Sequence, residues 1–198
     1  NLIFVVRKEH VDSHGIDEIL KSKYGSDIKV IIIDYVTEGT LCTCLVAEKY
    51  INNKDSLTIF TPDCYFEPKF YYPKETSSSG RFKWNRDKQE FDALVATFRS
   101  QAPAHSYVRL NTNNVVQEAR EKEVISNHAI GGLYYFKSGF DFVSYAKVMI
   151  EKNIRVNNEF YIAPIFNIMI SEQFKITIDK NTRHDILGTP KDIERHEI

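Results

Sequence analysis

Acidic side chains that could bind a metal or a phosphorylated ligand stand where predicted strands end, and Asp63 is the clearest of them. It follows the apolar run Leu57–Phe60, in a turn that Pro62 opens. A carboxylate at the end of a buried strand is a common ligand of Mg²⁺. Aspartate after proline also often caps the next segment. Position alone therefore leaves two interpretations of Asp63, a metal ligand and a capping residue.

The segment Thr37–Thr40, of sequence TEGT, is a candidate for contact with a nucleotide because it follows one predicted strand and opens a helix. Gly39 would let the backbone approach a flat ligand such as a base, and Thr40 would cap the helix. An ordinary strand-to-helix turn has the same features. The GxGxxG and P-loop patterns are both absent from the sequence, so neither supports the nucleotide interpretation.

An adjacent acid and base, Glu121 and Lys122, could divide the work on a sugar phosphate. The carboxylate would accept hydrogen bonds from ring hydroxyls while the ammonium binds the phosphate. On its own, such a pair in a stretch as charged as REKE is more typical of a solvated surface. Nearby, Gly131 and Gly132 would either bring the backbone close to a sugar or mark a β-bulge.

Arg155 and Glu159 flank a polar segment before an apolar run. Arg155 could bind phosphate, and Glu159 could hold a sugar hydroxyl or stand in the first turn of a helix. The six histidines are dispersed, without HxH, HxxE or HExxH spacing, so we assign them no metal or catalytic role. Together these side chains suit the positioning and neutralising of phosphates, which is most of what a protein contributes to phosphoryl-type transfer.

The elements that must position these residues follow from the apolar pattern, which predicts an α/β protein. The predicted strands are Leu2–Val6, Lys29–Ile33, Leu57–Phe60, Ala93–Phe98, Tyr107–Leu110, Leu133–Phe136 and Phe174–Ile178. The predicted helices are Ile16–Tyr24, Thr40–Tyr50, Asp141–Lys152 and Asn158–Ile170, with a last helix starting at Thr189–Asp192. Alternating strands and helices at the start predict parallel pairing of the first three strands, and the later strands predict an antiparallel or mixed extension.

Length and composition limit the remaining possibilities. The 198 residues suffice for one sizeable domain, 1–198, which we expect to include an excursion at 67–90 rich in proline, serine and charge. The 26 basic and 27 acidic residues balance, so no nucleic-acid partner is predicted. The apolar runs are too short to span a membrane, and the three cysteines lack zinc-site spacing, so we expect a cytoplasmic protein with reduced thiols. Apolar residues in the late helices favour a homo-oligomer.

Six motifs in this order resemble the sugar-phosphate nucleotidyltransferase superfamily, the relatives of glucose-1-phosphate thymidylyltransferases and cytidylyltransferases. They are TPD (Thr61–Asp63), SYVRL (Ser106–Leu110), REKEVIS (Arg120–Ser126), GGLYYF (Gly131–Phe136), RVNNEFYIAP (Arg155–Pro164) and LGTPKD (Leu187–Asp192). The resemblance implies a Rossmann-like, three-layer α/β/α fold with a mostly parallel, partly mixed central sheet. It also implies an enzyme that joins a nucleoside triphosphate to a sugar 1-phosphate and releases pyrophosphate.

The same resemblance implies a role for each candidate residue. Asp63 would be the catalytic Mg²⁺ ligand, and Lys122 would be the catalytic residue whose ammonium meets the phosphate. Gly39 and Thr40 would contact the nucleotide. The residues implied for the sugar-phosphate pocket are Tyr107, Glu121, Gly132, Arg155, Glu159 and Gly188.

The sequence departs from this family in two places that bear on activity. The family's glycine-rich loop, with its arginine and a downstream lysine, has no counterpart here, so we expect this chain to be inactive unless such a segment comes from elsewhere. Ile186 stands where many relatives carry a second metal-binding aspartate, one residue after Asp185. A non-catalytic domain that binds a ligand or regulates a partner is therefore the alternative to an enzyme.

Overall fold

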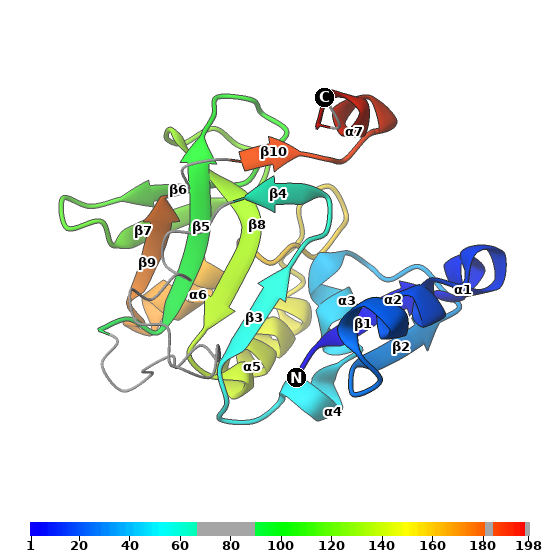
Figure 1. Ribbon diagram of the computed structural model, residues 1–198. Coiled ribbons are helices and arrows are strands. Elements are labelled where there is room, and N and C mark those ends of the chain that lie inside the picture. Colours follow the sequence, from blue (N-terminus) through cyan, green and yellow to red (C-terminus); the bar gives the residue numbers. More distant parts are fainter. Residues whose placement is uncertain (67–89, 181–183, 197–198) are drawn as a thin grey trace, which may run out of the picture.

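A computed structural model of the chain describes residues 1–66, 90–180 and 184–196 (Figure 1). Most of the predicted excursion at 67–90 lies outside these residues. In the described part, the chain forms a central mixed sheet, two smaller sheets and seven helices. The prediction of an α/β protein with a mixed central sheet is confirmed.

The central sheet has six strands in the order β7-β6-β8-β5-β9, and β3 also pairs with β8. The strands are β3 (Leu57–Phe60), β5 (Ala93–Arg99), β6 (Tyr107–Leu110), β7 (Val116–Arg120), β8 (His128–Phe136) and β9 (Ile176–Lys180). Within this sheet, β5 and β9 are the only described strands that pair in parallel, so its pairing is mainly antiparallel and the expected mostly parallel sheet is corrected. Parallel neighbours need a long crossover, and the chain runs from β5 to β8 without a helix.

The first two strands stand apart from this sheet. β1 (Ile3–Arg7) and β2 (Lys29–Ile33) pair in parallel, as predicted, and form a two-stranded sheet of their own. The prediction that β3 continues this parallel series is wrong, since β3 pairs antiparallel with β8. β4 (Cys64–Phe66) and β10 (His184–Ile186), which the sequence did not predict, form a short antiparallel pair.

Two of the helices bury several apolar residues against one side of the central sheet. The helices are α1 (Lys8–His14), α2 (Ile16–Tyr24), α3 (Thr40–Leu45), α4 (Glu48–Ile51), α5 (Gly139–Glu151), α6 (Ile165–Ser171) and α7 (Pro190–His196). Phe142 and Met149 of α5 join Phe166 of α6 and Phe136 of β8 in one core, and Figure 1 shows both helices behind the sheet. The apolar residues that suggested self-association are thus largely buried in the chain's own core.

Two predicted helices are shorter in the structure. The predicted helix at Thr40–Tyr50 is divided into α3 and α4. The prediction for Asn158–Ile170 holds only from Ile165 onward: Asn158 (φ 66°) takes a left-handed conformation, and residues 159–164 are not helical. The prediction for Ile16–Tyr24 is confirmed in full, with Gly25 (φ 91°) as its C-cap. None of the described helices is long and apolar enough to cross a membrane.

Candidate active site

The turn that carries Asp63 is fixed between two other segments of the chain. The Thr61 backbone N–H donates to the Gly132 carbonyl at 2.9 Å. The Cys64 thiol donates to the Gly131 carbonyl at 3.2 Å. On the other side, the Leu187 N–H donates to the Asp63 carbonyl at 2.7 Å. The Asp63 carboxylate is left exposed at the end of β3, beside the segment that leads to Gly188.

Gly132 owes its conformation to this turn. Its φ is +80°, and a β-carbon there would collide with Thr61 Oγ1 and lie 2.7 Å from Cys64 Sγ. The register between β5 and β8 shifts beside it, between Val95 and Thr97, so the β-bulge interpretation is confirmed, although within β8 and not at its start. Gly132 lets the Asp63 turn approach β8, whatever contact it also makes with a ligand.

Glu121 and Ser106 belong to a polar cluster at the end of β7, which also includes Lys122, Glu159 and Tyr161. The Ser106 hydroxyl donates to the half-buried Glu121 carboxylate. Burial raises the pKa of Glu121, and Glu159 adds to the rise, while the Ser106 hydrogen bond and the Lys122 charge oppose it. A carboxylate whose pKa is raised by burial readily accepts hydrogen bonds from ligand hydroxyls, because few other donors compete for it.

Lys122 follows Glu121 in a left-handed conformation, with φ 55°. Such a conformation is uncommon for a residue with a side chain, and it turns Lys122 away from the direction of β7. Its ammonium donates to the Tyr161 hydroxyl at 2.7 Å and lies 4.8 Å from the centroid of the Tyr161 ring. The hydrogen bond to Tyr161 is the main cause of a raised Lys122 pKa.

Glu159 reaches the same cluster from an extended segment. It is exposed, Phe160 is buried, Tyr161 is half-buried and Ile162 is buried. This alternation places Glu159 and Tyr161 on one side; burial raises the pKa of Tyr161, and the Glu159 carboxylate adds to the rise. Because the helix starts only at Ile165, the interpretation of Glu159 as a first-turn helix residue is wrong. Tyr161 was missed, and the strand-like alternation from Glu159 to Ile162 was the signal that could have revealed it.

The structure places Tyr107 differently from the other predicted pocket residues. The residue is fully buried, and its hydroxyl donates to the Ala102 carbonyl at 2.7 Å. In this arrangement it offers a ligand no exposed atom. Its neighbour Ser106, which contacts Glu121, is the residue of the SYVRL motif that stands in the cluster.

The TEGT loop packs against the segment that carries Glu159. The Phe160 N–H donates to the Glu38 carbonyl at 2.8 Å, and the Leu41 N–H donates to the Phe160 carbonyl at 3.1 Å. Gly39 is the N-cap of α3 without any side-chain capping bond, so the prediction that Thr40 caps this helix is wrong. Thr40 itself is exposed on the first turn.

Arg155 clamps the same two segments together. Its Nε donates to Asn153 Oδ1 at 2.6 Å and its Nη1 to the Asn158 carbonyl at 3.0 Å. Its Nη2 pairs with the Glu38 carboxylate, and the guanidinium lies 3.9 Å from the centroid of the Phe160 ring. Most of its donors therefore serve the loop, and phosphate binding by Arg155 has less support in the structure than its role as a clamp.

A buried tyrosine, Tyr134, feels the charge of both Asp63 and Glu121. Tyr134 of β8 is buried, and burial raises its pKa well above the ordinary value. The negative charges of Glu121 and Asp63 both add to that rise, so both carboxylates lie within electrostatic reach of one hydroxyl. Predicted residues from β3, β7 and the segment after α5 thus gather at one end of the sheet.

The residues present fit Mg²⁺ only in an open mode of binding. Among the described residues, no group of three or more His, Cys, Asp or Glu side chains is arranged to hold a metal ion. Mg²⁺ commonly keeps several waters and binds through one or two carboxylates together with substrate phosphates. The single exposed carboxylate of Asp63 suits that mode. Ile186, paired with Cys64 across β10 and β4, supplies no second one.

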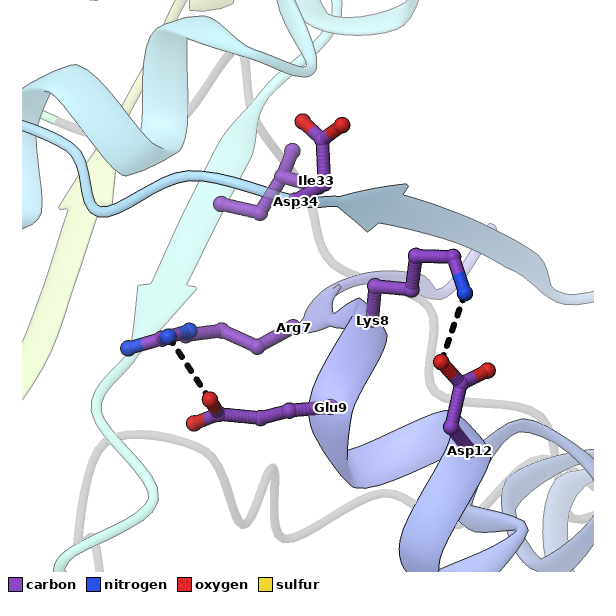
Figure 2. Close-up of a pocket in the computed structure, with 6 residues that line it drawn as sticks. All are labelled: Arg7, Lys8, Glu9, Asp12, Ile33 and Asp34. Carbon is purple, nitrogen blue, oxygen red and sulfur yellow. Dashed lines mark hydrogen bonds and ion pairs between the residues drawn. The ribbon is translucent and has the colours of Figure 1, made fainter.

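A separate polar pocket of about 210 Å³ lies at the carboxyl ends of β1 and β2 (Figure 2). It is lined by Arg7, Lys8, Glu9, Asp12, Ile33 and Asp34. Its two cations are paired within the pocket, Arg7 with Glu9 at 2.9 Å and Lys8 with Asp12 at 2.5 Å. Figure 2 shows the Asp34 carboxylate pointing away from both pairs, on the strand end that leads into the TEGT loop.

Comparison with known proteins supports the fold through structure alone. A comparison with protein-family models finds no match, and a comparison with curated protein sequences finds none either. The nucleoside-diphosphate-sugar pyrophosphorylase from Vibrio cholerae RC9 is similar in structure, with a TM-score of 0.77, 19% identity and coverage of 98% of this chain and 78% of that one.

Two further solved structures agree. A putative glucose-1-phosphate thymidylyltransferase from Bacillus anthracis has a TM-score of 0.70 at 16% identity, with 98% of this chain and 74% of that one covered. The inositol-1-phosphate CTP transferase from T. maritima has a TM-score of 0.66 at 15% identity, with 96% and 71% covered. At such identities the likeness shows that the chain has the nucleotidyltransferase fold, and chemistry must be argued from its own residues.

Proposed function

We propose that this chain is a Mg²⁺-dependent nucleotidyltransferase domain that couples a nucleoside triphosphate to a sugar 1-phosphate or a similar phosphorylated acceptor, with release of pyrophosphate. The observation that carries the proposal is the cluster in which Glu121, Lys122 and Glu159 converge, on a fold shared with such enzymes. Carboxylates suit sugar hydroxyls and an ammonium suits the phosphate on the same molecule. We place the reaction in the cytoplasm, in the synthesis of activated sugars.

In the proposed reaction, an oxygen of the acceptor phosphate attacks the α-phosphorus of the nucleotide, and the bond to pyrophosphate breaks. Lys122 would bind the acceptor phosphate, while Glu121 and Glu159 would accept hydrogen bonds from the sugar hydroxyls. Asp63 would hold Mg²⁺, which when bound neutralises charge on the phosphates. The TEGT loop around Gly39 would lie on the nucleotide side, held in place by the Arg155 clamp.

The proposal is tested with the protein expressed from its complete reading frame. Purified protein is given Mg²⁺, each nucleoside triphosphate and a panel of sugar 1-phosphates, and released pyrophosphate is measured. We expect release with one pair of substrates, and a loss of at least about 100-fold in Asp63→Asn, because the metal loses its charged ligand. Asp27→Asn, which changes an exposed carboxylate far from the cluster in sequence, is the matched control and should retain activity. No release with any pair would end the catalytic proposal.

The second candidate is a binding or regulatory domain with the same fold. Ile186 at the position of a second acid, beside Cys64, favours it. This candidate predicts that a sugar phosphate binds in a calorimetric titration and that Lys122→Met abolishes the binding, while no pyrophosphate is released. We retain the homo-oligomer as a prediction that sedimentation would test.

A further inference from the structure

Tyr161 contacts Lys122 directly, on the side of the cluster that also carries Glu159. Its hydroxyl oxygen accepts a hydrogen bond from the Lys122 ammonium at 2.7 Å, and the Glu159 carboxylate lies within electrostatic reach of both groups. The Tyr161 ring also faces the ammonium, with 4.8 Å from the nitrogen to the ring centroid. The side chain therefore contacts Lys122 through its hydroxyl and its ring at once.

This arrangement matters because Lys122 has carboxylates nearby, with which an ammonium would ordinarily form an ion pair. Glu121 and Glu159 both lie within electrostatic reach of Lys122. Nevertheless, none of the ion pairs found in residues 1–66, 90–180 and 184–196 includes Lys122. A neutral hydroxyl accepts one of the three ammonium donors, so two donors and the whole positive charge remain for an anion.

The hydroxyl also stays neutral. Burial raises the pKa of Tyr161, the carboxylate of Glu159 raises it further, and Lys122 opposes the rise. A phenol that keeps its proton accepts from Lys122 without neutralising the ammonium. Tyr161 thereby gives Lys122 a fixed, uncharged partner in surroundings where an ion pair with a carboxylate would be the alternative.

We propose that Tyr161 is a positioning residue that holds the Lys122 ammonium free of carboxylates and aims it at the phosphate of the acceptor. The inference rests on the proposed function and adds to it how the phosphate-binding charge is kept available. Lysine has a flexible stem with many rotamers, so a fixed partner lowers the entropy cost of holding the charge in one place. The chemical class of ligand is a phosphate monoester, which takes up both remaining donors.

The test is a double-mutant cycle in the protein from the complete reading frame. Tyr161→Phe removes the hydroxyl and keeps the ring. We expect it to raise the KM for the acceptor and lower kcat/KM by about 10- to 100-fold, as for loss of a hydrogen bond to a charged group, while the KM for the nucleotide stays unchanged. In the Lys122→Met background the same change should have almost no effect, because Tyr161 acts through Lys122.

Tyr50→Phe is the matched control, since Lys49 lies over the Tyr50 ring on α4, 4.7 Å from its centroid. The Tyr50→Phe enzyme should have the kinetics of the unmodified protein. If the unmodified protein is active and Tyr161→Phe behaves like Tyr50→Phe, or if Tyr161→Phe costs equally in both backgrounds, the positioning role is wrong and the proposed function stands. If the unmodified protein neither binds a sugar phosphate nor releases pyrophosphate, the proposed function itself fails.

Discussion

The carbonyl oxygen of Phe160 lies 2.5 Å from the point where a β-carbon on Gly39 would stand. The Phe160 nitrogen is 2.8 Å from the same point, and the φ of Gly39 is +118°, a conformation that side chains rarely adopt. Gly39 is thus needed where two segments meet, the TEGT loop and the segment that carries Glu159. The group that comes close to Gly39 is the protein's own backbone. This contact explains why the residue is glycine, without any contact to a nucleotide base.

We therefore expect Gly39→Ala to lower the free energy of unfolding by more than about 2 kcal/mol, because it adds a backbone collision to a conformational penalty. Gly15→Ala is the control: its φ is +58°, and a β-carbon there meets nothing within 4 Å. It should show the conformational penalty alone, of about 1 kcal/mol. Urea denaturation of both variants measures the difference, and equal losses would contradict the packing role of Gly39.

The pKa of Glu121 predicts a dependence of stability on pH. Because the folded pKa lies above the unfolded one, the folded protein binds the proton more tightly, and ionised Glu121 reduces stability. Glu121→Gln should therefore be more stable than the unmodified protein at pH 8. This advantage should shrink as the pH falls through the folded pKa, and be lost below the ordinary carboxyl value. Unfolding free energies from pH 4 to 8 test this, and an advantage that grows toward acid would contradict it.

The three thiols are expected to react in a definite order. Burial raises the pKa of Cys44 to about 12 and that of Cys64 to about 11. Burial also raises the pKa of Cys42, but the charge of Arg155 opposes the rise there. Since the thiolate is the reactive form, iodoacetamide at pH 8 should label Cys42 first and the other two only slowly. Mass spectrometry of timed samples measures the order, and urea should equalise the rates.

Local signals predicted much of the fold where the deciding contacts are close in sequence. The helix Ile16–Tyr24 ends where Gly25 takes a positive φ, and Pro190 starts α7 behind Thr189, whose hydroxyl bonds to Asp192. Strand pairing depended on distant segments, so β3 was predicted to pair with the wrong neighbour. The stretch from Asn158 was misjudged because apolar residues of an extended segment and of α6 follow each other directly, and together they imitate a helical pattern.

The candidate site shows the same division. Glu121 and Lys122 are adjacent, so the sequence could present them as a pair. The partners that decide their behaviour are far away: Tyr161 is 39 positions from Lys122, and Glu38 is 117 positions from Arg155. No spacing rule links such residues, because tertiary packing brings them together. Arg155 was assigned to phosphate for this reason, although the structure provides it with protein partners.

Because the backbone of Lys122 is left-handed, its side chain is expected to lower the stability of the fold while it serves function. Lys122→Gly removes the side-chain strain at φ 55°, and we expect it to stabilise the fold by about 1 kcal/mol while activity and sugar-phosphate binding are lost. Gln173→Gly is the matched control, since Gln173 has φ 66° at the end of α6, away from the cluster, and it should gain stability with activity intact. Thermal unfolding with activity assays distinguishes the two. If Lys122→Gly is less stable while Gln173→Gly is stabilised, the hydrogen bond from Lys122 to Tyr161 supports the fold. The strained backbone at Lys122 would then not be explained by ligand binding.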